Sequence, residues 1–518
     1  MSRISNKTVA KAAGVILAIS IIGRLLGFVR EQVIAARFGT SMLTDSYLMA
    51  FTLPNLIYVI IGGALATALI PVFTEHAVQS GKKTASRMSS TIINLTILGM
   101  LFLCGLGIWA APLLIAGIAP GFSGETRLLT IELSRIMFPC TIFMALSLLL
   151  GGILNSFKKF AIPTLTAVVF SAAIILAVYL LVPFWGIYGL AVGTVIGSLL
   201  QVIIQIPALR RLDIGYHLEI DLASPGVRKV GELMLPAMIG ISINQIYITV
   251  DRILASGLIE GSIAALNFAN RLMFLPYNLF VVAINTAVFP TLSEQAAEKN
   301  YVEMGRTTVF GLNLIAFFTI PAAVGLFVLS EPLVRLLFEH GVFDSRSTQM
   351  TAVALNFYVL GLFAQGAYNI INRTYFALQD TKTPVKVGFC TVLLNIIFSL
   401  ILIRYLAHGG LALATSIAAT CNLVIIYYLL RKRLNTLPEK ELFTTMGKII
   451  LAALIMGIIV YTANIFLGNI LDPVSIKDQF LHVGGCVILG LFVFAILVLP
   501  LKIREVDYLK NKILARFK

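Results

Sequence analysis

Three charged residues lie inside the first long apolar stretch of the chain, and their chemistry is that of an anion-binding site. Arg24, Arg30 and Glu31 fall within residues 10–37, where most neighbours are aliphatic. An arginine near the centre of a bilayer costs about 2.5–3.5 kcal/mol, so it usually faces a protein-lined or hydrated cavity. Guanidinium groups bind phosphates through paired hydrogen bonds. We therefore expect an anionic, phosphate-bearing guest near these arginines.

A second polar pattern follows one face of a later apolar stretch, residues 264–290. Asn267, Arg271, Asn278 and Asn285 occupy positions i, i+4, i+11 and i+18. At about 100° per residue they share one helix face, allowing for a kink at Pro276. Lipid cannot solvate such a face. The pattern predicts a cavity wall that carries these side chains.

Residues 230–257 contain a carboxylate that could couple transport to an ion. Asp251 is the only carboxylate well inside this stretch, and Asn244 lies seven residues before it on the same helix face. Two interpretations stay open. Asp251 binds a sodium ion or a proton, with Asn244 beside it, or it forms a local ion pair with Arg252.

Two further patterns have a simple structural interpretation. Arg30 and Glu31 can pair with each other if they lie near a helix end. Gln365, Asn369 and Asn372 form a polar stripe without a charge, and such amides commonly hold packed helices together. For that stripe we favour helix packing.

A membrane-spanning framework must position these residues. The 518 residues are 58% hydrophobic and only 12% charged, with a mean hydropathy of +0.95, which excludes an ordinary soluble enzyme. We expect an all-α polytopic protein with fourteen apolar segments, each long enough to cross about 30 Å of hydrocarbon. The segments are residues 10–37, 46–74, 89–113, 129–155, 161–183, 186–208, 230–257, 264–290, 306–329, 347–378, 384–404, 409–430, 445–467 and 480–501.

The motifs of common enzymes are missing from the sequence. No HExxH, GxSxG or Walker pattern occurs, the five histidines lie in loops or at segment edges, and the five cysteines are isolated. We therefore expect no catalytic residues, no metal site and no cofactor. A coupling ion, sodium or proton, and the membrane potential are the candidate energy sources.

The basic residues fix the expected orientation. Most of the 39 Lys and Arg residues fall in loops on one side of the predicted membrane, which by the positive-inside rule is the cytoplasmic side. Both termini are therefore predicted to be cytoplasmic. The net charge of +15 is dispersed over these short loops, so it is explained by orientation and does not indicate a nucleic-acid partner.

The chain contains an internal duplication. A shift of 222 residues places Arg30 on Arg252 and Pro54 on Pro276, and a shift of 221 places Pro163 on Pro384. The shift of 222 also matches Gly39 with Gly261, Leu53 with Leu275 and Asp45 with Asn267. Six segments separate the copies, which predicts two parallel repeats that form two lobes, with a substrate site between the lobes. The predicted domains are 1–222, 223–440 and 441–518, the last with two extra helices and a basic cytoplasmic tail.

Several motifs resemble those of one bacterial family. Residues 23–75, beginning GRLLGFVREQVIAARFG, resemble the start of the MurJ (MviN) family of lipid II flippases. Further similar stretches are APGF (119–122), FANRLMFLP (268–276), FPTLSE (289–294) and DTKTPVK (380–386). DTKTP alone is typical of the wider superfamily of multidrug, oligosaccharidyl-lipid and polysaccharide exporters.

The resemblance implies a flippase of the bacterial cytoplasmic membrane. Its substrate would be lipid II, the undecaprenyl-pyrophosphate-linked peptidoglycan precursor, moved from the inner to the outer leaflet by alternating access. Arg24, Arg30 and Arg271 match cavity arginines of the family, and Asp45 matches an acidic position at the start of its second helix. The expected partners are lipid II and membrane lipids, the expected state is a monomer, and no nucleic acid is involved. The full set of expected substrate-binding residues is Arg24, Arg30, Arg271, Glu31, Asp45, Asn267 and Asn278.

Three positions depart from the family pattern. Tyr58 follows the LPNL motif where many relatives carry a basic pair, and Asn270 and Phe274 stand where relatives often carry carboxylates. The headgroup contacts therefore cannot be copied from relatives, and Arg252 or Arg373 could replace a missing arginine. Another transporter of the superfamily, a polysaccharide-lipid flippase or a cation-coupled multidrug exporter, stays an alternative, as does a non-transporting membrane scaffold.

Overall fold

The computed structural model describes residues 6–212 and 214–501, which fold into helices joined by loops with no β-strand among them. Within this described part, nine helices are long and apolar enough to cross a membrane, or eleven when two bent helix pairs each count as one span. The all-α polytopic prediction is confirmed, but the number of fourteen spans is not. The predicted basic tail, residues 502–518, lies outside the described residues.

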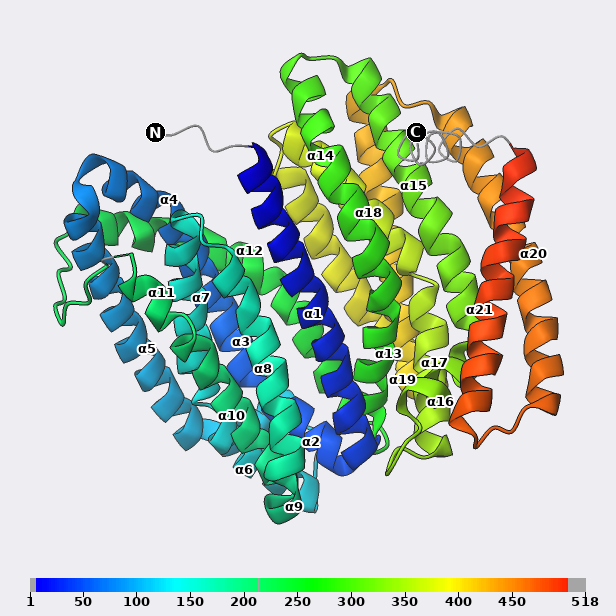
Figure 1. Cartoon of the computed structure of the whole chain (residues 1–518), viewed down its shortest axis with the longest axis horizontal. Helices are drawn as coiled ribbons and strands as arrows, with labels where there is room; N and C mark the ends of the chain where they lie inside the picture. The colour runs from blue at the N-terminus through cyan, green and yellow to red at the C-terminus, as the bar shows by residue number, and fades with distance from the viewer. Residues whose placement is uncertain (1–5, 213, 502–518) are drawn as a thin grey trace. The chain divides into compact units, whose positions relative to one another are not determined.

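The first of two compact units comprises Met1–Ala264. Figure 1 shows its helices in blue to green. They are α1 (Asn6–Phe38), α2 (Met42–Ala50), α3 (Thr52–Ile57), α4 (Gly63–Gln79), α5 (Gly81–Ile118), α6 (Gly124–Met137), α7 (Cys140–Ser156), α8 (Ala161–Leu180), α9 (Val182–Trp185), α10 (Ile187–Ile203), α11 (Ile206–Arg210) and α12 (Pro225–Ala255). Two apolar clusters hold these helices together. One contains residues of α1, α2, α6, α8 and α10, and the other contains residues of α4, α5, α7 and the start of α12.

The second compact unit comprises Ala265–Lys518. Its helices are α13 (Ser262–Pro276), α14 (Val282–Ala297), α15 (Tyr301–Val328), α16 (Ser330–Phe338), α17 (Ser345–Val359), α18 (Leu362–Ala377), α19 (Lys382–Leu434), α20 (Glu439–Ile470) and α21 (Ile476–Val498). One apolar cluster joins α14, α15, α18 and α19, and a second packs α20 and α21 against α15. Figure 1 shows α20 and α21 in orange and red.

The boundary of the compact units differs from the repeat boundary. Helix α12, which begins the second sequence repeat, belongs to the first unit, and α13 starts in the first unit and continues into the second. Helix α12 packs closely on α4, which accounts for its place in the first unit. The repeat-based domains stay a prediction about sequence history.

Unusual backbone features of the first unit recur in the second. A π-helical turn at Tyr58–Gly62 follows Pro54, and another at Tyr277–Val281 follows Pro276. Helices α6 and α7 meet at 41°, and their counterparts α17 and α18 meet at 42°. Positive φ angles recur at Gly39 (62°) and Gly261 (88°), at Lys158 (60°) and Gln379 (58°), and at Gly186 (54°) and Ala407 (47°). The two residues of each positive-φ pair are 221 or 222 residues apart, the spacing that the duplication predicts.

The last of these pairs explains why two predicted spans form one helical element. Helix α19 contains the predicted segments 384–404 and 409–430, and its only non-helical residue is Ala407, with φ 47° and ψ −128°. The counterpart Gly186, with φ 54° and ψ −135°, separates α9 from α10. Glycine adopts this conformation readily, whereas alanine is strained in it.

The DTKTP motif holds the start of α19 in place. The Asp380 carboxylate accepts hydrogen bonds from Lys382 N (3.1 Å), Thr383 N (3.0 Å) and Thr383 Oγ1 (2.8 Å), and it also pairs with Arg433 near the end of the same helix. Burial acts to raise the pKa of the Asp380 carboxyl. The Thr383 hydrogen bonds and the Arg433 charge outweigh it and hold that pKa below its usual range. The motif therefore joins the two ends of α19.

The strained residue in α19 yields a prediction. Ala407→Gly removes a Cβ from a conformation that costs non-glycine residues about 1–3 kcal/mol, so we expect it to raise the midpoint of thermal unfolding in detergent. Gly186→Ala should lower the midpoint by backbone strain alone, because a Cβ at Gly186 meets no atom within 4 Å.

Ala412→Gly is the matched control, since Ala412 is a buried helical residue of α19 and glycine there should destabilise the helix. If Ala407→Gly and Ala412→Gly lowered the midpoint of thermal unfolding equally, the assignment of strain to Ala407 would be contradicted.

Candidate functional site

The packing of α1 on α8 decides which charged side chains of α1 are buried and which are exposed. A Cβ at Gly23 would lie 3.5 Å from Val168 Cγ2, and one at Gly27 would lie 3.9 Å from Ser171 Oγ. Two small residues four apart let a second helix approach closely, and here that helix is α8. Arg24 lies about 100° around the helix from Gly23, and it is exposed on the first unit.

Arg30 and Glu31 form an ion pair at the α1–α8 contact. Arg30 Nη2 lies 2.7 Å from Glu31 Oε1, and the side chains are only 16% and 7% exposed. The Arg30 guanidinium also lies over the ring of Phe170 in α8, 5.7 Å from its centroid. Arg30 and Glu31 are consecutive residues and leave the helix about 100° apart, but the flexible end of the Arg30 side chain reaches back to the carboxylate. The simple interpretation of this pair, local pairing, is therefore confirmed.

This pairing matters for the chemistry of Arg30. A buried charge is tolerated when it is paired and hydrogen-bonded, and Glu31 together with the Phe170 ring provides that environment. The guanidinium carries five N–H donors in a planar fork. Glu31 therefore positions the Arg30 fork and neutralises part of its charge.

Asp45 lies at the start of α2 and is engaged by backbone groups far along the chain. Its carboxylate accepts hydrogen bonds from Gly261 N (2.7 Å) and Ala264 N (2.8 Å), and the residue is 3% exposed. Two N–H groups at the start of α13 are thereby satisfied, and a carboxylate there also suits the helix dipole. These contacts favour a positioning role for Asp45, whereas the resemblance predicted direct substrate contact.

Gly261 makes this contact possible. Its φ is 88°, and a Cβ there would lie 2.3 Å from the carbonyl oxygen of Thr40. Only glycine allows the loop before α13 to approach the loop before α2 so closely. Sequence reasoning matched Gly261 to Gly39 but missed this contact, although two glycines at the repeat offset were a signal that both loops are special.

Helix α12 is attached to the start of the second predicted span. Arg252 Nη1 donates to Leu48 O (3.1 Å) and to Thr52 Oγ1 (2.7 Å). Asp251, the neighbouring residue, is half-buried. The side chain of Asn244 lies outside the described residues. Arg252 therefore links α12 to α2 and α3 in the first unit.

The polar stripe on α13 does not continue unchanged to its predicted end. Arg271 is exposed, Asn267 and Asn278 are half-buried, and Asn285 is buried. The π-helical turn at Tyr277–Val281 winds more slowly than an α-helix. The turn changes the rotation of the helix between Asn278 and Asn285, so the single polar face through Asn285 stays a prediction.

The uncharged stripe on α18 makes packing contacts, as expected. Asn369 Nδ2 donates to Tyr277 Oη (2.6 Å) and to Gln365 O (3.0 Å), and Gln365 Nε2 lies 4.0 Å from Met273 Sδ. Arg373 lies over the ring of Phe289, 5.2 Å from its centroid. These contacts hold α18 against α13 and α14.

The structure thus places the predicted site residues in two groups. Arg24, Arg30, Glu31 and Asp45 belong to the first unit, together with α12 and Asp251; Asn267, Arg271 and Asn278 belong to the second. Within the described residues, no group of three or more His, Cys, Asp or Glu could hold a metal ion.

Comparison with known proteins places the chain among transporters. The profile of the family described as lipid II flippase MurJ matches residues 34–477. The chain is 31% identical over 491 residues to the probable lipid II flippase MurJ of Rickettsia prowazekii, covering 93% of this chain and 96% of that protein. It is 30% identical over 447 residues to the lipid II flippase MurJ of Burkholderia cenocepacia, covering 85% and 87%.

Solved structures agree on the fold. A lipid II flippase MurJ structure in an inward closed conformation superposes with a TM-score of 0.80 at 31% identity, covering 93% of this chain and 97% of that one. An inward-facing multidrug transporter of the MATE family superposes with a TM-score of 0.69 at 15% identity, covering 82% and 99%. The second similarity concerns the fold alone.

The contact at Asp45 yields a prediction about stability. Asp45→Ala leaves the N–H groups of Gly261 and Ala264 without their acceptor, at a cost of about 1–3 kcal/mol for each buried group. We expect a lower midpoint of thermal unfolding in detergent. Asp45→Asn keeps one acceptor oxygen and should lose less. If Asp45→Ala and Asp45→Asn were both as stable as the parent protein, the contact of Asp45 with the loop before α13 would not stabilise the fold.

Proposed function

Because this chain belongs to the lipid II flippase MurJ family, we propose that it moves lipid II from the inner to the outer leaflet of the bacterial cytoplasmic membrane. The transported precursor then supplies peptidoglycan synthesis. The family profile and relatives that cover most of the chain support the substrate. The helical fold and its many apolar spans support a transport role.

The exposed Arg24 carries the proposal for the site. It lies among apolar residues of α1, and its side chain is exposed, so its guanidinium is accessible to an anionic ligand. A diphosphate offers paired oxygens that match guanidinium geometry. We assign diphosphate binding to Arg24, Arg30 and Arg271.

Neighbouring residues have supporting roles in this proposal. Glu31 holds the Arg30 guanidinium, as the 2.7 Å contact between them suggests. Asn267 and Asn278 lie on the same helical run as Arg271 and offer amides to the sugar or peptide of the precursor. Asp45 fixes the start of α13, the helix that carries Arg271.

Transport is proposed to occur by alternating access, with the diphosphate in the hydrated site and the prenyl chain in lipid. No nucleotide-binding motif occurs in the sequence. A potential that is negative inside favours outward movement of an anion by about 2.3 kcal/mol per charge per 100 mV. Ion coupling through Asp251 is a second proposed source of energy.

The arginine assignment predicts a loss of transport. Arg24→Ala, Arg30→Ala and Arg271→Ala each remove a charge-assisted contact worth about 1.5–3 kcal/mol. Each variant should fail to rescue cells depleted of their own flippase while its membrane level is unchanged. The direct measurement is the accessibility of lipid II in each leaflet of proteoliposomes.

Arg37→Ala provides the matched control, because Arg37 is exposed in the last turn of α1 and lies outside the proposed site. It should rescue like the parent protein. Normal rescue by all three arginine variants would overturn the assignment of headgroup binding.

The coupling proposal predicts a changed ion dependence. Asp251→Asn removes the only carboxylate well inside α12, so transport by this variant should lose its dependence on sodium or on pH. Asp251→Glu keeps the charge and should retain that dependence. If transport by the parent protein and by Asp251→Asn depended on sodium and on pH in the same way, Asp251 would have no part in the coupling mechanism.

A further inference from the structure

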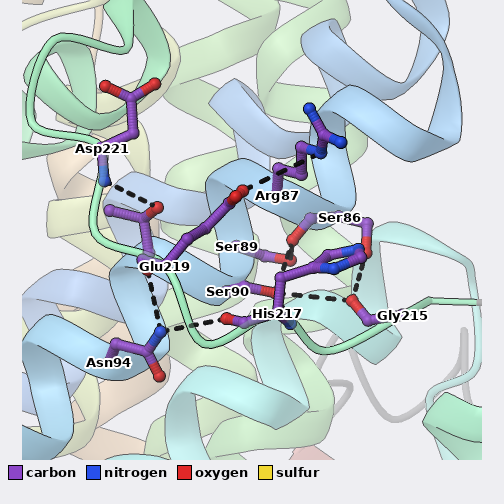
Figure 2. Close-up of polar contacts among 10 residues, drawn as sticks. Ser86, Arg87, Ser89, Ser90, Asn94, Gly215, His217, Glu219 and Asp221 are labelled. Carbon is purple, nitrogen blue, oxygen red and sulfur yellow. Dashed lines mark hydrogen bonds and ion pairs between the residues drawn. The ribbon is translucent and has the colours of Figure 1, made fainter.

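The segment that joins α11 to α12 is extended and lies along α5. Residues 214–223 contain no helix, and side chains of α5 bind their backbone (Figure 2). His217 N donates to Ser90 Oγ (3.1 Å), and Asn94 Nδ2 donates to His217 O (3.1 Å) and Glu219 O (2.9 Å). Asp221 N donates to Thr91 Oγ1 (3.3 Å). We call residues 214–223 the linker segment.

The linker segment alternates between two kinds of residue. Its odd-numbered residues supply the backbone groups that α5 binds, and Glu219 also lies 3.9 Å from Arg87. From residue 217 onward the even-numbered side chains are apolar and exposed, at 89% for Leu218, 49% for Ile220 and 61% for Leu222. Before this point Ile214 packs against the apolar cluster of α4, α5 and α7, and Tyr216 Oη donates to Asn94 Oδ1 (2.6 Å). Alternation of this kind is what an extended chain produces when one face is docked. A row of exposed large apolar side chains indicates a binding surface.

The surface of α5 shows what this row faces. Leu98 and Leu101 are exposed on α5, a predicted membrane span. They lie four and seven residues beyond Asn94, and therefore on the same side of the helix. The linker segment continues this lipid-facing stripe toward the start of α5. The linker segment covers the polar side chains of Ser90 and Asn94. The surface above them is therefore formed by the apolar side chains of the linker segment.

The surrounding charge fits a phospholipid surface. Lys82, Lys83 and Arg87 are exposed at the start of α5, and Arg210 and Arg211 are exposed just before the linker segment. Basic residues beside an apolar face are typical of segments that lie at an anionic leaflet. In Figure 1 the linker segment is the green loop at the left edge, beside α5.

We propose that the linker segment is an interfacial membrane anchor. α5 holds its backbone, Leu218, Ile220 and Leu222 enter the acyl region of the leaflet, and the basic residues contact anionic phospholipid headgroups. With the proposed orientation this is the cytoplasmic leaflet. The anchor goes beyond lipid II transport, because its ligand is bulk phospholipid and none of its residues belongs to the proposed diphosphate site.

Nitroxide scanning of the full-length protein tests the anchor. The five native cysteines are replaced, and single cysteines at 216–223 are spin-labelled after reconstitution into vesicles of phosphatidylethanolamine and phosphatidylglycerol. Labels at 218, 220 and 222 should be accessible to oxygen, which partitions into lipid, and labels at 217, 219 and 221 to a water-soluble nickel chelate. The accessibility ratio should therefore oscillate with a period of two residues.

A pair of α5 variants makes the test specific. Asn94→Ala removes three hydrogen bonds to the linker segment, with His217 O, Glu219 O and Tyr216 Oη, and should abolish the oscillation. Ser89→Ala should preserve it, because Ser89 Oγ donates within α5, to Ser86 O (2.9 Å). If Asn94→Ala does not fold, Leu218→Gln read with a label at 222 replaces it and should move that label toward water.

Two results would overturn the anchor. Equal access of the nickel chelate at all positions would show that the linker segment lies in water. Even-numbered labels shielded from both reagents would show that protein covers this face. Neither result measures lipid II movement, so the failure of the anchor is distinguishable from failure of the proposed function.

Discussion

The structure depends on one constraint, that hydrocarbon cannot solvate a polar group, so the protein must supply a partner for every polar group that it places there. Helices satisfy the backbone internally. Arg30 obtains Glu31 and the ring of Phe170. Asp45 obtains two backbone N–H groups. The same constraint applies to Arg24, an exposed charge within an apolar helix, which has to face protein, water or an anion.

Much of the fold could be predicted from sequence because apolar length is a local property. Each predicted segment is helical in the structure, and only 384–404 and 409–430 share one helical element, α19. What could not be predicted depends on contacts across the chain. The partners of Asp45 lie 216 and 219 residues away and are backbone groups, so the glycine pair at the repeat offset marked the loops but did not identify the contact. Likewise, α12 joins the first compact unit through packing on α4, which a repeat alignment does not contain.

The residue types of the candidate site could be predicted from the sequence, but the directions and partners of the side chains could be predicted less well. Local pairing of Arg30 with Glu31 was one interpretation of the sequence, whereas the contact of Arg30 with Phe170 of α8 depends on how the helices pack. A kink at Pro276 was anticipated, but the π-helical turn that follows it and changes the rotation before Asn285 was not. For Asn369 the expected packing role is confirmed, since its amide binds Tyr277.

Ala407 carries a consequence for how this chain has diverged. Its backbone matches that of Gly186 to within a few degrees in both dihedral angles, 47° and −128° against 54° and −135°, although one copy has alanine where the other has glycine. The two halves therefore share the shape of this turn without sharing its residue. Ancestry between the two halves is recorded more durably in main-chain torsions than in side-chain identity.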